Sequence, residues 1–420
     1  MIFVDRWFKL DNAAKFYSSV VSASDSYVFR NSAVLYEPVD KDNLQKSVDL
    51  VRSRYPILFV RMRRGVFWNY LDSNDESFVV EEEKSYPCSR INPVINNGYF
   101  LKVLFYGNRI SVEIFHSLTD GIGAFEFLKS LLYYYFLFSG FELDSEGKIL
   151  LSDGYVPLDN LEDSFSVYYD KMKLNLKKSP NAYRISGTPF SNRGNRVTTG
   201  VLSASELNRV AKTKNVSITV YLTAVLIYSI FMTRHVHRKM KPIVIGIPVN
   251  LRNEFPSTTL RNFFILVNVG MKVTKETKFE EIIEIVSKEL KEKTTKEALK
   301  YDIFKFVWIE KSIAGKFIPL RIKKAIVNAS YRLRSENKKT ITFSNLGKVS
   351  LPQSMNSLIS HMEAVIYLTK KSPINVSICS VNDRLSISFS RWIEEKELPC
   401  YFFRFIAKQS GVDVSVYSNE

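Results

Sequence analysis

The chain has 420 residues, enough for two or three domains and a large buried core. Apolar residues make up 45% of it and aromatic residues 13%, which excludes a disordered chain, while the few glycines, prolines and cysteines exclude collagen-like and disulfide-rich classes. The net charge of +16 favours an anionic partner, such as nucleic acid, anionic lipid or a phosphate-bearing cofactor or carrier, or else a lysine-rich surface that serves solubility.

Cysteine usage and hydropathy suggest a cytoplasmic protein. Cys88, Cys379 and Cys400 are odd in number and far apart, so we expect neither a disulfide framework nor a zinc site. The first nine residues carry charges where a secretory signal needs an apolar core, so no signal peptide is expected. The longest uncharged run, residues 215–233, contains polar side chains throughout and predicts a buried helix rather than a membrane span.

The first 150 residues alternate helical and strand-like patterns. A helix is predicted over residues 40–55, where apolar side chains recur at steps of four and three after Asp40, a good N-cap. Strand patterns then predict two hairpins, one formed by 58–63 and 66–71 and the other by 100–105 and 109–115. A buried, aromatic-rich helix is predicted at 124–138.

Prolines and glycines scattered through polar sequence predict a connector at 151–195, between an N-terminal lobe at 1–150 and a C-terminal lobe at 196–420. The C-terminal lobe is expected to be mixed as well. Its first predicted helix has Ser203 or Ser205 as its N-cap. Two further helices are predicted at 217–232 and 279–301, and the last is expected to be an outer solvated helix with Glu284–Lys288 and Glu292–Lys296 pairs. Its predicted strands are 196–202, 243–249, 340–343, 364–368, 374–378 and 385–389. The whole is a mixed α/β fold in two comparable parts.

Among the four histidines, His116 is the candidate for chemistry. It follows an apolar strand and precedes a short polar turn, where a general base is firmly held yet projects into a cleft. The alternative is a core histidine in a strand-to-helix turn. His235 and His237 lie in a basic patch typical of a solvated face, and His361 has no acidic or cysteine partner at metal-binding spacing.

The turn after His116 adds a carboxylate and two glycines. Asp120 can order the turn or pair with an arginine, and Gly121 and Gly123 would let a substrate approach the backbone closely. No metal site and no nucleotide-binding glycine loop is indicated, and no nucleic-acid motif is present.

His116, Asp120 and Gly121 fit the HxxxDG motif of the acyltransferase superfamily that includes chloramphenicol acetyltransferase, plant BAHD acyltransferases, condensation domains of peptide synthetases and alcohol acetyltransferases. Other stretches resemble the same superfamily in the same order: Arg54-Tyr55-Pro56-Ile57-Leu58, the start of the buried helix at 215–222, Pro248-Val249-Asn250-Leu251-Arg252, and Thr342-Phe343-Ser344-Asn345-Leu346-Gly347. The resemblance spans about residues 40 to 390.

Three departures limit this resemblance. Phe115 stands where many condensation domains carry a second histidine, and the DFGWG signature of the plant branch is missing. We also expect the chain to act alone, since no carrier or adenylation domain accompanies it. The alcohol acetyltransferase branch is therefore the most similar.

The resemblance implies two chloramphenicol acetyltransferase-like lobes that form a pseudo-dimer, with a channel between them. In that picture His116 Nε2 removes a proton from an acceptor alcohol or amine, which attacks an acyl thioester without a covalent acyl-enzyme. Ser344 or Asn345 is the expected donor to the oxyanion, although both would also suit a turn that closes a strand. Asp120 is expected to be structural and to bridge to Arg252, which could otherwise be a surface residue.

The resemblance suggests that the net positive charge of the chain serves to bind the acyl donor. Acyl-CoA carries phosphates and an acyl carrier protein is acidic, so either donor would be drawn to a basic channel mouth. Lys338 and Lys339 are our candidates for donor binding, within a wider basic set whose safer interpretation is a solvated helix: Arg321, Lys323, Lys324, Arg332 and Arg334.

These arguments predict an alcohol O-acetyltransferase-like enzyme that uses acyl-CoA and a small alcohol or amine acceptor. One alternative is a free-standing condensation-like enzyme with a carrier-bound donor. The other is a non-catalytic binding protein of the same fold.

Overall fold

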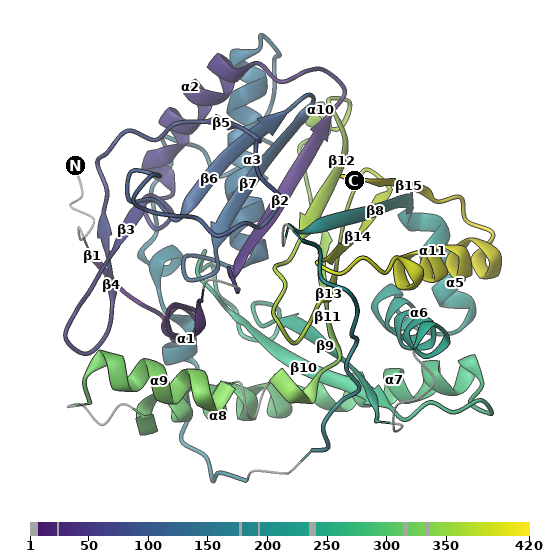
Figure 1. Cartoon of the computed structure of the whole chain (residues 1–420). Coiled ribbons are helices and arrows are strands. Elements are labelled where there is room, and N and C mark those ends of the chain that lie inside the picture. Colours follow the sequence, from purple (N-terminus) through teal and green to yellow (C-terminus); the bar gives the residue numbers. More distant parts are fainter. Residues whose placement is uncertain are drawn as a thin grey trace.

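The computed structural model describes residues 7–22, 25–175, 179–191, 194–234, 241–313, 318–331 and 336–420. His235, His237, Arg332 and Arg334 lie outside the described residues. Within them the chain forms two lobes, each built on one large sheet (Figure 1).

The first lobe is a five-stranded sheet covered by two helices. Its strands lie in the order β12 (Ile359–Val365), β2 (Val28–Leu35), β7 (Arg109–Phe115), β6 (Leu101–Tyr106) and β5 (Glu81–Glu82). Helix α3 (Gly121–Phe138) packs on β2 and β7, and α2 (Lys41–Val51) packs on α3. The predicted N-cap is confirmed, since the Asp40 carboxylate accepts a hydrogen bond from Asn43 N at 2.7 Å.

The second lobe is a seven-stranded sheet. Its order is β10 (Phe264–Met271), β9 (Ile243–Asn250), β11 (Ile341–Lys348), β13 (Ile374–Val381), β14 (Arg384–Arg391), β8 (Arg196–Ser203) and β15 (Ser415–Ser418). The apolar helix α6 (Ile218–Thr233) is largely buried, as predicted, and packs on three helices: α5 (Ala204–Thr213), α7 (Phe279–Lys293) and α11 (Glu397–Ser410).

One strand crosses between the lobes. Strand β12 follows β11 in sequence but pairs with β2, at the edge of the first lobe's sheet. The pattern at 364–368 predicted a strand that overlaps β12 only at its last two residues. The lobes also share packed side chains, because Tyr17 and Phe115 belong to the second lobe's core. The lobe boundaries at 150 and 195 stay a prediction, and they did not anticipate this exchange.

A small sheet on the left of Figure 1 and three helices beside and below it flank the lobes. The sheet has the order β1 (Trp7–Lys9), β4 (Tyr70–Ser73) and β3 (Val60–Arg63). Near it lie α1 (Asn12–Val20), α8 (Lys296–Ile313) and α9 (Leu320–Ser330), and α9 packs on α1. The remaining short elements are η1 (Arg52–Arg54), η2 (Leu158–Leu161), α4 (Ser164–Val167), η4 (Glu336–Lys338) and α10 (Gln353–Asn356).

The predicted helix over 279–301 is wrong in its continuity. Helix α7 ends at Lys293, and the next helix is capped by Thr295, whose hydroxyl accepts a hydrogen bond from Ala298 N at 3.2 Å. The described residues contain a Glu289–Lys293 ion pair here rather than the two predicted pairs. Glu289, Glu292 and Lys293 also line a cavity, so this segment is not simply an outer solvated face.

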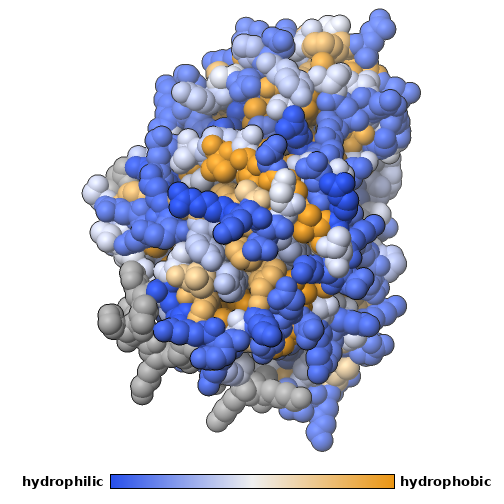
Figure 2. Space-filling view, turned by 90° about the vertical axis from the view of Figure 1, so that its right-hand side faces the viewer, coloured by the Kyte–Doolittle hydropathy of each residue, from blue (hydrophilic) through white to orange (hydrophobic). Residues whose placement is uncertain are grey.

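The surface is mainly hydrophilic on the side shown in Figure 2, with apolar side chains in small groups between charged ones. Among the described helices, none is both long and apolar enough to cross a bilayer alone. Only α5 and α6 together reach that length and composition, and they are bent by 81°.

Candidate active site

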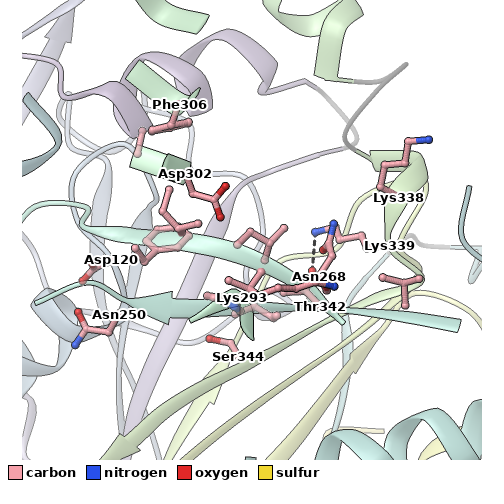
Figure 3. A pocket seen from close by; sticks show the side chains of 18 of the residues that line it. Asp120, Asn250, Asn268, Lys293, Asp302, Phe306, Lys338, Lys339, Thr342 and Ser344 are labelled. Atoms are coloured by element: carbon pink, nitrogen blue, oxygen red, sulfur yellow. Dashed lines mark hydrogen bonds between the residues drawn. The ribbon is translucent and has the colours of Figure 1, made fainter. Parts of the chain in front are cut away.

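A cavity of about 1030 Å³ lies where the two lobes meet. The first lobe contributes the turn that follows β7, including His116, Asp120 and Gly121, and helix α1 contributes Tyr17. The second lobe contributes residues of β9, β10 and β11, and Figure 3 shows several of their side chains around the cavity. The predicted site residues His116, Asp120, Gly121, Arg252, Ser344, Asn345, Lys338 and Lys339 all line it.

His116 is held at both its backbone and its ring. Its backbone N–H donates to Tyr27 O at 2.9 Å, which extends the pairing of β7 with β2 by one residue. Its Nδ1 lies 2.9 Å from Asn262 Oδ1, and Asn262 Nδ2 donates to His116 O at 3.0 Å. Because the amide nitrogen is committed to that carbonyl, its oxygen faces Nδ1 and accepts the proton there. The tautomer that follows leaves Nε2 as the basic nitrogen.

Aromatic rings surround the imidazole of His116. Tyr17 stacks on it at 4.4 Å between ring centroids, and Phe29 and Phe264 lie 4.8 and 5.5 Å away. Burial among these rings lowers the pKa of His116 to about 4, against the smaller opposing influence of the Asp120 charge. The ring is therefore neutral at neutral pH and available as a base.

Both carboxylate oxygens of Asp120 accept hydrogen bonds from other residues of the protein. Its Oδ1 accepts from the backbone N–H groups of Ile122 and Gly123 as the N-cap of α3. Its Oδ2 accepts from Arg252 Nη1 at 2.9 Å and from Phe263 N at 3.0 Å. The predicted bridge from Asp120 to Arg252 is confirmed.

Arg252 fastens the loop that carries the histidine's partner. Besides its bond to Asp120, it donates through Nε to Thr259 O at 3.1 Å and through Nη2 to Arg261 O at 2.6 Å. Asn262 follows immediately in the chain. The pair of Asp120 and Arg252 thus positions Asn262, which in turn positions His116.

The glycines after Asp120 serve packing within the protein. A Cβ at Gly123 would collide with the Leu260 carbonyl oxygen, and one at Gly121 would lie 2.6 Å from Leu346 Cδ2 of β11. The expectation that a substrate chain approaches Gly123 is wrong, because the second lobe's own backbone occupies that place. Gly121 makes the turn close against β11 while still lining the cavity.

The two candidate oxyanion donors differ in their engagement. The Asn345 amide donates to Thr219 Oγ1 at 2.7 Å and accepts from Gly347 N at 2.8 Å, so it joins β11 to α6 and closes a turn in which Gly347 has a φ of 76°. The Ser344 hydroxyl has no hydrogen-bond partner among the described residues. Ser344 is therefore the better candidate.

The basic residues of the cavity have definite partners. Lys339 donates to Thr342 Oγ1 at 2.7 Å, and burial lowers its pKa to about 8 (Figure 3). Lys338 donates to Asn181 Oδ1 at 3.0 Å and to Ser179 O, which ties it to the connector. Lys293 donates to Asn268 O at 2.8 Å.

One member of the wider basic set is not on a solvated face. Lys323 is 1% exposed, and its ammonium lies 5.0 Å from the centre of the Trp68 ring and 5.5 Å from that of Phe67.

His361 has an acidic neighbour in Glu363, but the two do not belong to a metal-binding cluster among the described residues. Its Nε2 lies 3.8 Å from Glu363 and 2.7 Å from the Tyr417 hydroxyl. It does not line the cavity that contains His116. Among the described residues, no group of three His, Cys, Asp or Glu could hold a metal ion.

Asn262, Tyr17 and Lys293 were missed by the sequence interpretation. Asn262 lies 146 positions from His116 and stands before an ordinary apolar strand, so no local pattern distinguishes it. Tyr17 lies on a short helix whose contact with His116 depends on the packing of the two lobes.

We predict that Asn262→Ala lowers turnover about 10- to 100-fold, because the ring loses the contact that fixes its orientation and tautomer.

Asn262→Asp keeps an acceptor for Nδ1 but adds a negative charge, which should raise the pKa of His116 and move the acidic limb of the pH–rate profile to higher pH. Turnover at saturating substrate and the pH profile of kcat/KM would test both. An unmoved profile in Asn262→Asp would exclude this positioning role.

No protein-family model and no curated protein sequence matches the chain. Solved structures do match over nearly the whole length. The first condensation domain of the calcium-dependent antibiotic synthetase, bound to a substrate analogue, superposes with a TM-score of 0.64 at 11% identity and covers 97% of each chain. The chain has the condensation-domain, chloramphenicol acetyltransferase-like fold.

Two further solved structures have this fold. TRI3 trichothecene 15-O-acetyltransferase from Fusarium sporotrichioides gives a TM-score of 0.59 at 11% identity, covering 96% of this chain and 94% of that one. Polyketide synthase associated protein 5 from Mycobacterium tuberculosis gives 0.59 at 14% identity, covering 96% and 97%. The predicted two-lobed fold is confirmed.

Proposed function

We propose that the protein is an acyltransferase that moves an acyl group from a thioester to a hydroxyl or amine, with His116 as the general base. The observation that carries the proposal is the neutral, desolvated imidazole of His116, whose Nδ1 is held by Asn262 in a cavity between the lobes. The similarity of the fold to that of TRI3, a trichothecene 15-O-acetyltransferase, supports the reaction class.

The reaction follows from the free Nε2. It removes the proton from the acceptor hydroxyl or amine as that group's oxygen or nitrogen attacks the thioester carbonyl. The Ser344 hydroxyl donates to the oxyanion, a contribution worth roughly 3 kcal/mol at comparable sites. Collapse breaks the carbon–sulfur bond, and the leaving thiolate takes the proton from the imidazolium. The products are an ester or amide and a free thiol, with His116 neutral again and no acyl-enzyme formed.

We propose acyl-CoA as the donor, held in part by Lys339 and with Lys338 ordering the connector beside it. Both lysines line the cavity, and the cavity is large enough for an extended ligand. The second candidate is a carrier-bound donor, which the similarity to condensation domains supports equally. The acceptor is a small alcohol or amine in either case.

Thiol release from a panel of acyl-CoAs, acyl-pantetheines and carrier-bound donors, with mixed alcohols and amines, would test the proposal. We expect the KM for acyl-CoA to rise with ionic strength, since salt screens the long-range attraction between the donor's phosphates and the basic protein over about 8–10 Å. The truncated donor, which lacks the nucleotide, should bind more weakly and show a flatter salt response. Lys339→Gln should raise the donor KM several-fold while sparing turnover at saturation.

The matched control is Lys348→Gln, on the same strand β11 but exposed and outside the cavity. Equal efficiency and equal salt response for the full and truncated donors would argue against CoA. Release only from the carrier-bound donor would favour the condensation-like alternative. Release from no donor would leave a binding protein of this fold.

A further inference from the structure

The outward face of α9 is apolar. Ile322, Ala325, Ile326 and Ala329 are exposed and follow one another at steps of three, one and three, which places them on one side of the helix. Ile322 is 53% exposed and Ile326 41%. A helix on the surface of a globular protein normally turns such a stripe toward the core, so this face is patterned for a partner.

The loop between β3 and β4 extends this face. Leu320 N, at the start of α9, donates to Val66 O at 3.2 Å, and Lys323 of α9 contacts the ring of Phe67. Val66 is 75% exposed and Phe67 42%. We call the exposed side chains of Val66, Phe67, Ile322 and Ile326 the α9 patch.

Cations without partners border the α9 patch. Arg64, Arg321 and Lys324 form no ion pair with any described residue, and neither α9 nor residues 61–70 contain an Asp or Glu. The nearby Arg64 charge adds to burial in lowering the pKa of Lys324, so these two cations repel each other. An anion bound between them would relieve that repulsion.

The combination of apolar side chains and unneutralised cations selects the occupant. A second copy of this chain would bring like charges together, since the net charge is +16. Nucleic acid would leave the aliphatic side chains without stacking partners. An anionic lipid surface satisfies both features, because apolar side chains enter the headgroup boundary while cations meet the headgroups.

We propose that the α9 patch docks the protein on the surface of an anionic lipid bilayer. The patch lies on the edge of the molecule formed by α9 and the β1–β4–β3 sheet (Figure 1). On its inner side, α9 leads to Tyr331, which packs against Phe16 of α1 at 4.9 Å, and both residues line the cavity. Docking therefore brings one wall of the cavity to the membrane.

Co-sedimentation of the full chain with large unilamellar vesicles tests this proposal without any substrate. We expect binding to vesicles of phosphatidylcholine with phosphatidylserine, much weaker binding to phosphatidylcholine alone, and loss of binding at high salt. Ile322→Asp with Ile326→Asp should lower the apparent partition coefficient at least about tenfold. Both sites are exposed, so the fold should tolerate the change, which circular dichroism would verify.

The matched control is Val94→Asp with Ile95→Asp, in an exposed loop that belongs neither to α9 nor to the β3–β4 hairpin, where the side chains are 86% and 78% exposed. This variant should bind vesicles as the wild type does. Arg321→Glu with Lys324→Glu is a second test that leaves the apolar stripe intact, and it should also lose binding. The proposal would be overturned if the wild-type protein did not bind anionic vesicles, or if the patch variants bound them normally. It would also be overturned if the wild type were a dimer that Ile322→Asp makes monomeric.

Discussion

His116→Ala should lower turnover by about 10²–10⁴-fold, because the reaction loses its general base. The protein should stay folded, because the fold loses only one partly buried ring at the edge of a cavity. The substitution leaves the Asp120–Arg252 pair untouched, so the loop that carries Asn262 should hold its place. Turnover with the best donor and acceptor, together with thermal unfolding, would measure both effects.

The control for His116→Ala is His361→Ala, since that histidine contacts Tyr417 and lies outside the cavity. It should keep near-normal turnover. If His116→Ala keeps near-normal turnover as well, His116 has no part in the mechanism.

Asp120→Asn should damage stability and activity together. The neutral amide leaves the Arg252 guanidinium without its counter-charge, in a pair whose side chains are only 11% and 6% exposed. Breaking a buried pair in this way typically costs about 3–5 kcal/mol of unfolding free energy. Activity should fall as well, because Phe263 N–H loses its acceptor next to Asn262. Denaturant unfolding and turnover would be measured side by side.

Asp72→Asn is the matched control for that variant. Asp72 pairs with Arg61 and Arg63 on a largely exposed surface, with side chains 27%, 36% and 48% exposed, so its loss should cost less than about 1 kcal/mol. An inactive Asp120→Asn that unfolds like the wild type would indicate a direct chemical role for Asp120 and contradict its structural assignment.

Local signals in the sequence were enough for much of the secondary structure. Asp40 and Ser203 cap helices as predicted, and the strands at 101–106 and 109–115 form the predicted hairpin around Gly107. These features depend on neighbouring residues, so short-range chemistry decides them. The break between α7 and α8 was not predicted, because the periodic pattern of charged residues continues across Thr294 and Thr295. In the structure these residues end one helix and cap the next.

Long-range contacts could not be predicted in the same way. The crossing of β12 to the first lobe depends on its pairing with β2, more than 300 positions earlier in the chain. His116 and Asp120 were identified from the strand-to-turn pattern and Arg252 from the resemblance, whereas Asn262 was not identified. Its role arises only because Arg252 and Asp120 bring its loop under the imidazole.

The pH dependence of kcat/KM for thiol release, measured on the wild type and His116→Ala from about pH 4 to 8, tests the central claim most directly. A free histidine has a pKa of about 6.5, whereas burial lowers that of His116 to about 4, so the base is already neutral over this range. We predict a wild-type rate that is nearly constant from about pH 6 to 8 and falls only as the pH approaches 4, with His116→Ala at least about 100-fold slower throughout. Equal rates for the two proteins, or a wild-type rate that falls steeply below about pH 6.5, would contradict a desolvated His116 as the base of acyl transfer.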